Sequence, residues 1–136
     1  MSLAEESRRV VLHWIECAVE GRFDELMALG APDATWWISG LKETSPLTGT
    51  YPYAERAKHL KEMLKEAISF TFAIIGITTE ADTVVVEGIP RVEAQDGRIY
   101  VNDAMVKFVV KDGKIQSIRE YVDFIPFLKF KEAKAS

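Results

Sequence analysis

Apolar residues early in the chain recur with the period of an α-helix. Between residues 5 and 20 they fall at steps of three and four, which places them on one helix face. Gly21 is a typical helix end, and residues 22–30 predict a second, short helix closed by Gly30. Residues 54–68 predict a third helix, whose apolar face carries Ala57, Leu60, Leu64 and Ile68.

The remaining pattern is that of β-strands. Short runs of apolar and β-branched residues predict strands over residues 34–40, 70–80, 83–95, 98–111 and 114–124. Gly76 predicts a bend in the second of these strands. Asp112 and Gly113 suit the left-handed backbone of a type I′ turn, or of the related three-residue turn, so the last two strands are expected to form a hairpin.

This order of elements predicts one α+β domain over residues 1–136. Three helices are expected on one face of a curved, mixed but mainly antiparallel sheet of up to five strands. Residues 39–53 predict a long loop, a common form for a lid, and residues 129–136 a frayed polar tail. Several strands are apolar on both faces, so a second copy of the chain is expected to cover the open face in a homodimer.

Composition and charge narrow the classes of function. Hydrophobic residues make up 48% of the chain and charged residues 28%, which is typical of a globular domain. The net charge is −4 and the lysines and arginines form no basic stripe, which argues against a nucleic-acid partner. No apolar run reaches membrane-spanning length and the first residues lack a signal-peptide core, so a soluble, cytoplasmic protein is expected.

Metal, nucleotide and redox chemistry have little support in the sequence. The single cysteine, Cys17, excludes an internal disulfide. His13 and His59 lie far apart and neither has a recognisable metal-ligand spacing with Cys17, although carboxylates could complete a site. No serine-hydrolase, phosphate-binding or dinucleotide-binding motif is present, so neither a metal nor a cofactor is expected.

Glu120 is the first candidate for chemistry. Strand alternation places Glu120 on one face with Ile118 and Val122, and Arg119 and Tyr121 on the other. If the first face lines a cavity, burial raises the pKa of the carboxyl and makes Glu120 a general acid or base. The alternative is a structural ion pair with a neighbouring arginine or lysine.

Tyr100 and Asn102 form the polar end of another strand face. They share the parity of Ala104, Val106 and Phe108, so they are expected to point to the same side as these apolar residues. One interpretation is a hydrogen-bonding pair that polarises a carbonyl or hydroxyl of a ligand. The other is a buried pair that satisfies backbone groups.

Glu87 and Arg91 interrupt an otherwise apolar strand. Glu87 either lines the pocket or pairs with Arg91. Arg91 could then orient a substrate carboxylate or hold Glu120.

Aromatic side chains are expected around the core and the cavity: Trp14, Trp36, Trp37, Phe70 and Phe72. They suit a flat apolar ligand, but aromatic residues at such spacings also serve as core packing. Tyr51 and Tyr53 either close the mouth of the cavity or anchor the loop. The predicted ligand contacts are Trp14, Trp36, Ile38, Tyr53, Leu64, Phe72, Glu87 and Ile118.

Four short segments carry a resemblance to a known family. They are "EG" at 87–88, "GRIYVND" at 97–103, "KDGKI" at 111–115 and "REYVD" at 119–123. With the helix, helix, strand order before them, they resemble the SnoaL-like branch of the ketosteroid isomerase and NTF2-like superfamily. The resemblance implies a cone-shaped fold, a curved sheet around helices with an apolar cavity. Because enzymes and non-enzymes share this fold, it does not imply one function.

Two enzyme groups of the superfamily give residue-level expectations. The matches to the oxyanion-hole tyrosine and the catalytic aspartate of ketosteroid isomerases are Trp14 and Ile38, so that mechanism is not implied. Limonene-epoxide hydrolases use an Asp-Arg-Asp arrangement. Their motifs resemble Arg91-Val92-Glu93 and the segment containing Glu120, with glutamates in place of both aspartates.

Two functions from different classes follow. The first is a cofactor-independent enzyme of isomerase, cyclase or hydrolase type that acts on an apolar small molecule. Its catalytic residues would be Glu120, Tyr100, Asn102 and Arg91. The second is a domain of the same fold that binds a small molecule or a protein without turnover.

Overall fold

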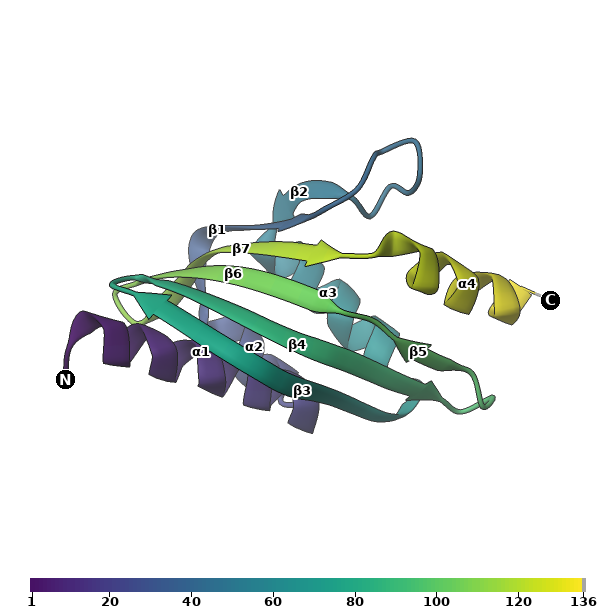
Figure 1. Ribbon diagram of the computed structural model, residues 1–136, viewed down its shortest axis with the longest axis horizontal. Coiled ribbons are helices and arrows are strands. Elements are labelled where there is room, and N and C mark those ends of the chain that lie inside the picture. Colours follow the sequence, from purple (N-terminus) through teal and green to yellow (C-terminus); the bar gives the residue numbers. More distant parts are fainter. Residues whose placement is uncertain (136) are drawn as a thin grey trace.

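The computed structural model describes residues 1–135 of the 136-residue chain. Helices and strands follow one another in a mixed order (Figure 1). The elements are α1 Leu3–Glu20, α2 Phe23–Ala28, β1 Gly30–Ile38, β2 Gly49–Pro52, α3 Tyr53–Leu64, β3 Ala67–Glu80, β4 Thr83–Ala94, β5 Ile99–Val101, β6 Ala104–Lys111, β7 Lys114–Val122 and α4 Phe124–Ala135. Within residues 1–135, no helix combines the length and apolar character needed to span a membrane.

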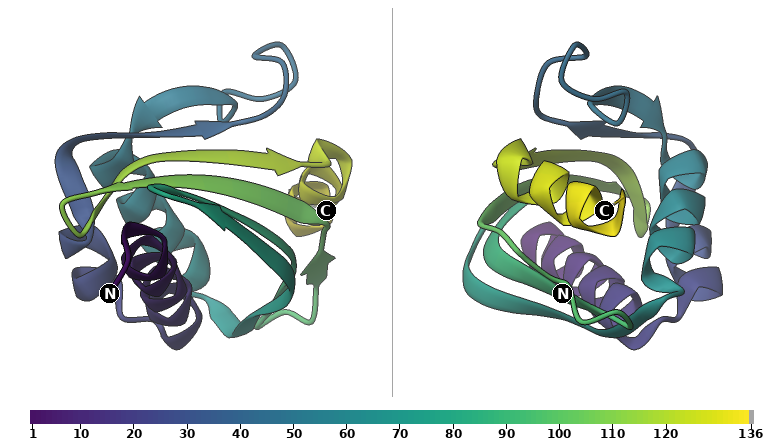
Figure 2. Two further views of the ribbon diagram at one scale, coloured as in Figure 1. Left: turned by 60° about the vertical axis from the view of Figure 1, so that its left-hand side comes forward. Right: turned by 90° about the vertical axis from the view of Figure 1, so that its right-hand side faces the viewer.

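The strands form one mixed sheet of seven members in the order β2-β1-β7-β6-β4-β3, with β5 paired to β4. Within residues 1–135, β1 and β7 are the one parallel pair, and the other neighbouring strands run antiparallel. The sheet curves around α1, and α3 covers its other end (Figure 2). This arrangement confirms the expected α+β fold with a curved, mainly antiparallel sheet.

Local chemistry explains the turns and bends of the sheet. Asp112 and Gly113 have φ values of 52° and 75°, so both adopt the left-handed backbone expected for the β6–β7 hairpin. The pairing of β3 with β4 shifts register between Ile74 and Gly76, which is the predicted irregularity at Gly76. The shift bends β3 and helps the sheet to curve.

Some predicted boundaries differ from the structure. The expected loop over residues 39–53 contains β2 and the start of α3. The expected strand over residues 98–111 is divided into β5 and β6, with Asn102 and Asp103 between them. The third helix ends at Leu64, and Ile68 lies on β3 with 63% of its surface exposed instead of packing on a helix face.

The prediction of a frayed tail over residues 129–136 is wrong for residues 129–135, which form the second half of α4. The backbone N–H of Ile125 donates to Asp123 Oδ1 at 3.0 Å, which caps the helix start. Pro126 is tolerated because it lies in the first turn, where no intrahelical N–H donor is required. Residue 136 lies outside the described residues.

The three N-terminal helices meet at one buried tyrosine. The Trp14 indole on α1 donates to the Tyr53 hydroxyl at 2.8 Å, and that hydroxyl donates to the backbone oxygen of Leu26 on α2 at 2.5 Å. Trp36 of β1 packs edge-on against Trp14, with ring centroids 5.5 Å apart. Tyr53 is therefore a core residue at the start of α3, and its packing fixes the helices relative to β1.

Candidate functional site

A pocket of about 560 Å³ lies between the concave face of the sheet, α1, α3 and α4. Its size is within the range of small-molecule sites, which is roughly 300–1,000 Å³. Apolar side chains form most of its wall, including Phe70 and Phe72 of β3 and Val106 of β6. A few polar groups interrupt this wall, and they decide what chemistry the pocket can support.

Glu120 is the carboxylate that β7 directs into the pocket. Its neighbours at the same strand parity, Ile118 and Val122, confirm the expected alternation, because Ile118 is buried in the core and Val122 lines the pocket. The Trp36 indole Nε1 donates to Glu120 Oε1 at 2.9 Å. Burial raises the pKa of Glu120, against the opposing effects of this hydrogen bond and of the Arg56 charge.

Arg56 is the buried cation of the site. It projects from α3, and its guanidinium donates to two backbone oxygens, from Nε to Trp36 at 2.9 Å and from Nη2 to Gly49 at 2.6 Å. Burial lowers the pKa of Arg56, while the nearby charge of Glu120 opposes this. The described residues include no ion pair between Arg56 and Glu120 within 4.0 Å, so Arg56 acts on Glu120 through the pocket at longer range.

Tyr100 and Asn102 are neighbours, and only Tyr100 lines the pocket. The Asn102 amide donates to the Tyr100 hydroxyl and to the backbone oxygen of Asp123, both at 2.7 Å, and its oxygen accepts from the Asp103 N–H at 2.8 Å. Asn102 therefore satisfies backbone groups, which is the second of the two interpretations that the sequence left open for this residue. Burial raises the pKa of Tyr100 to about 12, so its hydroxyl remains protonated at neutral pH and can donate to a ligand.

Helix α4 closes one end of the pocket with three phenylalanines, Phe124, Phe127 and Phe130. Tyr100 packs edge-on against Phe127 and Phe130 with centroid distances of 6.2 and 5.9 Å. Arg98 donates to the backbone oxygen of Phe130 at 2.9 Å and lies over its ring. Figure 2 shows α4 across the end of the space between the sheet and α3.

Most of the residues predicted to contact a ligand do line the pocket: Trp14, Trp36, Ile38, Leu64 and Phe72. The indole N–H of Trp14 is not available to a ligand, because it donates to Tyr53. Tyr53 and Ile118 are fully enclosed in the core and do not reach the pocket. Tyr51 anchors the loop through a 2.6 Å hydrogen bond from its hydroxyl to the Pro46 backbone oxygen.

The structure places Glu87 and Arg91 on the opposite face of the sheet. Residues of β4 that line the pocket have the other parity, as Pro90 and Val92 do. Arg91 pairs with Glu93 at 3.7 Å rather than with Glu87 or Glu120. The expected pocket position of Glu87 and Arg91 is therefore wrong, and so is the match of Arg91-Val92-Glu93 to the epoxide-hydrolase arrangement. Trp37 also lies on this outer face, where Arg119 stacks 3.9 Å above its ring.

Residues 11–118 match the SnoaL-like domain family. The chain belongs to that family. No match to a curated protein was found.

Solved structures agree with the SnoaL-like fold. An NTF2-like protein from Burkholderia xenovorans is 24% identical with a TM-score of 0.72, covering 93% of this chain and 95% of that one. An epoxide hydrolase from M. tuberculosis described as LEH-like is 19% identical with a TM-score of 0.75, covering 93% and 90%. A putative isomerase from Bacillus subtilis is 20% identical with a TM-score of 0.79, covering 97% and 96%. At these identities the similarity establishes the fold alone.

Sequence reasoning missed two parts of this SnoaL-like site, Arg56 and the aromatic face of α4. Arg56 lies three residues after Tyr53 and four before Leu60, which places its charge within the buried stripe of α3. The three phenylalanines recur every third residue after a capping Asp123. Both signals were present in the chain and were obscured by the many lysines around them.

Proposed function

We propose that the pocket binds an apolar small molecule and that Glu120 serves as a general acid or base toward it. The observation that carries this proposal is a carboxyl with a raised pKa at the wall of a largely apolar pocket. A carboxyl in this environment exchanges a proton closer to neutral pH than an exposed glutamate does, which suits acid or base catalysis.

Arg56 and Tyr100 supply complementary functions in this proposal. The fixed positive charge of Arg56 stabilises the carboxylate form of Glu120 without a direct ion pair. The protonated Tyr100 hydroxyl can donate to a carbonyl, hydroxyl or epoxide oxygen of the ligand. Glu120 would then take a proton from carbon or from water while Tyr100 stabilises the charge that develops on that oxygen. The hydrolase and isomerase descriptions of similar structures support these two reaction classes as the ones to test.

A second function, binding without turnover, has a specific observation in its favour. The side chains of Trp14, which matches the oxyanion-hole tyrosine of the isomerases, and of Asn102, considered for polarising a ligand, already use their donors within the protein. Among the strand residues that the structure describes, Tyr100 and Glu120 are the polar side chains that line the pocket, apart from the Trp36 indole that is bound to Glu120.

The experiment has two stages. A mixed library of apolar epoxides, ketones and terpenoid-like compounds is first screened for bound species by native mass spectrometry, and each bound species is then followed for conversion. Substitution Glu120→Gln keeps the size of the side chain and its acceptor for Trp36. We expect it to lower turnover by at least about 100-fold, the usual contribution of a positioned acid or base, while binding persists.

Glu80→Gln is the matched control, since it makes the same chemical change at an exposed position at the end of β3. Turnover that Glu120→Gln leaves intact would overturn the catalytic role. Bound ligand that neither protein converts would establish the second function instead.

A further inference from the structure

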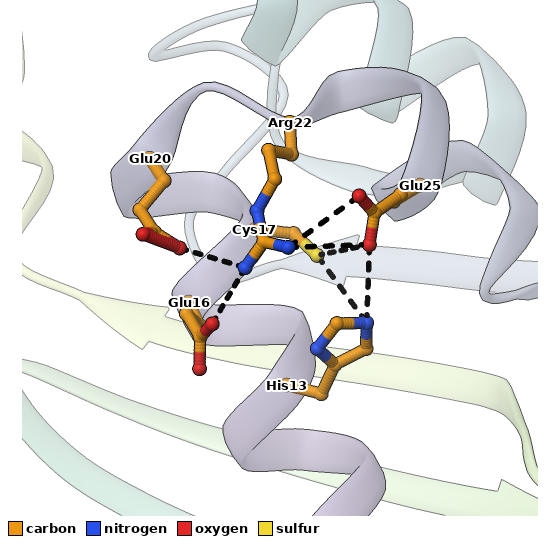
Figure 3. A network of polar contacts seen from close by, with 6 residues as sticks. All are labelled: His13, Glu16, Cys17, Glu20, Arg22 and Glu25. Carbon is orange, nitrogen blue, oxygen red and sulfur yellow. Dashed lines mark hydrogen bonds and ion pairs between the residues drawn. The ribbon is translucent and has the colours of Figure 1, made fainter.

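Three side chains with different metal-binding atoms meet outside the pocket: His13 and Cys17 of α1 and Glu25 of α2. Their candidate ligand atoms all lie within 4.8 Å of one another. None of the three lines the pocket, so this cluster is separate from the site proposed above. Figure 3 shows the three side chains converging at the junction of the two helices.

The local fold builds this cluster from a short stretch of sequence. His13 and Cys17 are four residues apart, so they lie one above the other on the same face of α1. Gly21 ends α1 in the left-handed conformation with φ 73°, and the chain turns back into α2. Arg22 secures the turn, with Nη2 at 2.6 Å from Glu16 and 2.7 Å from Glu20.

The distances match one face of a zinc tetrahedron. Zinc lies about 2.3 Å from a sulfur ligand and about 2.0–2.1 Å from a nitrogen or oxygen ligand. In a tetrahedron, two ligand atoms are therefore about 3.6 Å apart when one of them is sulfur, and about 3.4 Å apart otherwise. The observed distances are 3.6 Å from Cys17 Sγ to His13 Nε2, 3.9 Å from Cys17 Sγ to Glu25 Oε2, and 3.4 Å from His13 Nε2 to Glu25 Oε2. An ion would require shifts of only a few tenths of an ångström.

The charges around the cluster favour a cation. Glu16, Glu20 and Glu25 contribute three carboxylates, and the single guanidinium of Arg22 contacts all three. Arg22 Nη1 lies 3.4 Å from Glu25 Oε1 and 3.5 Å from Oε2, so it holds the carboxylate, whose Oε2 also faces His13 and Cys17. Such outer contacts orient a metal ligand.

The donor set selects the kind of ion. Calcium and magnesium prefer oxygen ligands alone, whereas a thiolate, an imidazole and a carboxylate together suit zinc. Cys17 is fully buried, and the side chains of His13 and Glu25 are 41% and 50% exposed. The ion would therefore be reached from the solvent side, where a water molecule can serve as the fourth ligand.

We propose that His13, Cys17 and Glu25 form a zinc site that joins α1 to α2. Binding replaces the thiol proton of Cys17, which is released to solvent, with a sulfur–zinc bond, and no electron is transferred. The affinity for zinc is consequently expected to rise with pH.

Metal binding is tested on the full chain, freed of metal with a chelator and without any affinity tag. Zinc is titrated in competition with a chromophoric chelator, and Co²⁺ is used as a spectroscopic probe. We expect one Zn²⁺ per chain at micromolar concentrations. The Co²⁺ protein should show a thiolate-to-metal charge-transfer band and the intense visible bands of a tetrahedral complex. Zinc, but not magnesium, should raise the melting temperature.

Two variants assign the ligands. Cys17→Ser should abolish the charge-transfer band and weaken zinc binding by at least about 100-fold, more than the loss of an outer contact usually costs. Glu25→Gln changes an exposed residue, so it tests the site even if the buried Cys17→Ser variant folds poorly. Glu20→Gln is the control, because Glu20 contacts Arg22 but offers no ligand to the cluster, and it should bind zinc with little change. The absence of stoichiometric zinc binding, or binding that Cys17→Ser and Glu25→Gln leave unchanged, would overturn the proposal.

Discussion

Two opposing effects act on the pKa of the Glu120 carboxyl. Its position at the pocket wall removes water from the carboxyl, which disfavours the charged form. The Trp36 N–H and the charge of Arg56 favour that form without cancelling the effect of burial. The chain therefore gives up some stability to keep an ionisable group in the pocket, as is common at functional sites.

This cost predicts how stability depends on pH. The folded-state pKa of Glu120 lies above its ordinary value of 4.5, so the folded protein holds a proton that the unfolded chain releases. The contribution of Glu120 to stability is therefore fully present below about pH 4.5 and is lost as the pH rises through the raised pKa. The loss amounts to about 1.4 kcal/mol for each pH unit between the two pKa values.

Glu120→Gln should remove this dependence. Relative to the parent protein, the variant should gain in free energy of unfolding as the pH is raised from about 4 to about 8, measured by urea unfolding at each pH. Glu80→Gln, the same chemical change at an exposed position, is the control. A constant difference between parent and Glu120→Gln across this range would contradict a raised pKa.

At the scale of elements, α4 decides whether the pocket is closed. One side of the helix faces the pocket with Phe124, Phe127 and Phe130, and Ile125 lies on the other side with 59% of its surface exposed. Arg98 and Tyr100, on the connection to β5 and on β5 itself, hold the helix by a hydrogen bond and by ring contacts. The helix is thus attached by its aromatic side chains.

Phe127→Ser should loosen this attachment. The loss of a half-buried aromatic side chain is expected to lower the free energy of unfolding by about 1–2 kcal/mol. It should also speed release of any ligand found in the library screen, because α4 forms part of the wall. Ile125→Ser is the matched control on the exposed side, and its effect on stability should stay within about 0.5 kcal/mol. Equal effects of the two substitutions, measured by chemical unfolding and stopped-flow release, would mean that α4 does not close the pocket.

At the scale of the whole molecule, the outer face of the sheet carries exposed apolar and aromatic side chains. The helices of residues 1–135 lie on the concave face or at one end (Figure 1). Met105 and Tyr121 are cross-strand partners on the outer face, with 48% and 46% of their surfaces exposed, and Trp37 packs on Tyr121. We propose that a second copy of the chain covers this surface, because exposed apolar and aromatic residues that cluster on a sheet are typical of an interface.

Light scattering after size exclusion tests this association. At micromolar concentration the parent chain should have about twice the 15.3 kDa mass of one copy. Met105→Asp introduces a charge within the proposed interface and should shift the protein to the mass of one copy. Leu41→Asp makes a comparable change in the loop before β2, where Leu41 is 68% exposed, and should leave the mass unchanged. A parent chain that runs as a single copy would contradict the interface.

Much of the architecture was predictable from the sequence, because it depends on residues that are close together in the chain. The steps of three and four residues predicted α1, the Asp112–Gly113 pair predicted the β6–β7 hairpin, and strand alternation predicted the face of Glu120. These inferences held because each depends on neighbours within a few residues, where backbone geometry leaves few choices.

The tertiary structure decided the rest, because the remaining questions concern partners that are distant in the sequence. Asn102 has its donors bound to Tyr100 and to Asp123, 21 residues away, and Glu120 is hydrogen-bonded to Trp36, 84 residues away. Whether a polar side chain is free for a ligand depends on such partners, and the alternation of a strand carries no information about them. Strand alternation therefore placed Glu120 on the inner face but did not exclude Glu87 and Arg91 from it, and only the packing of α1, α3 and α4 around the sheet determined which side chains reach the pocket.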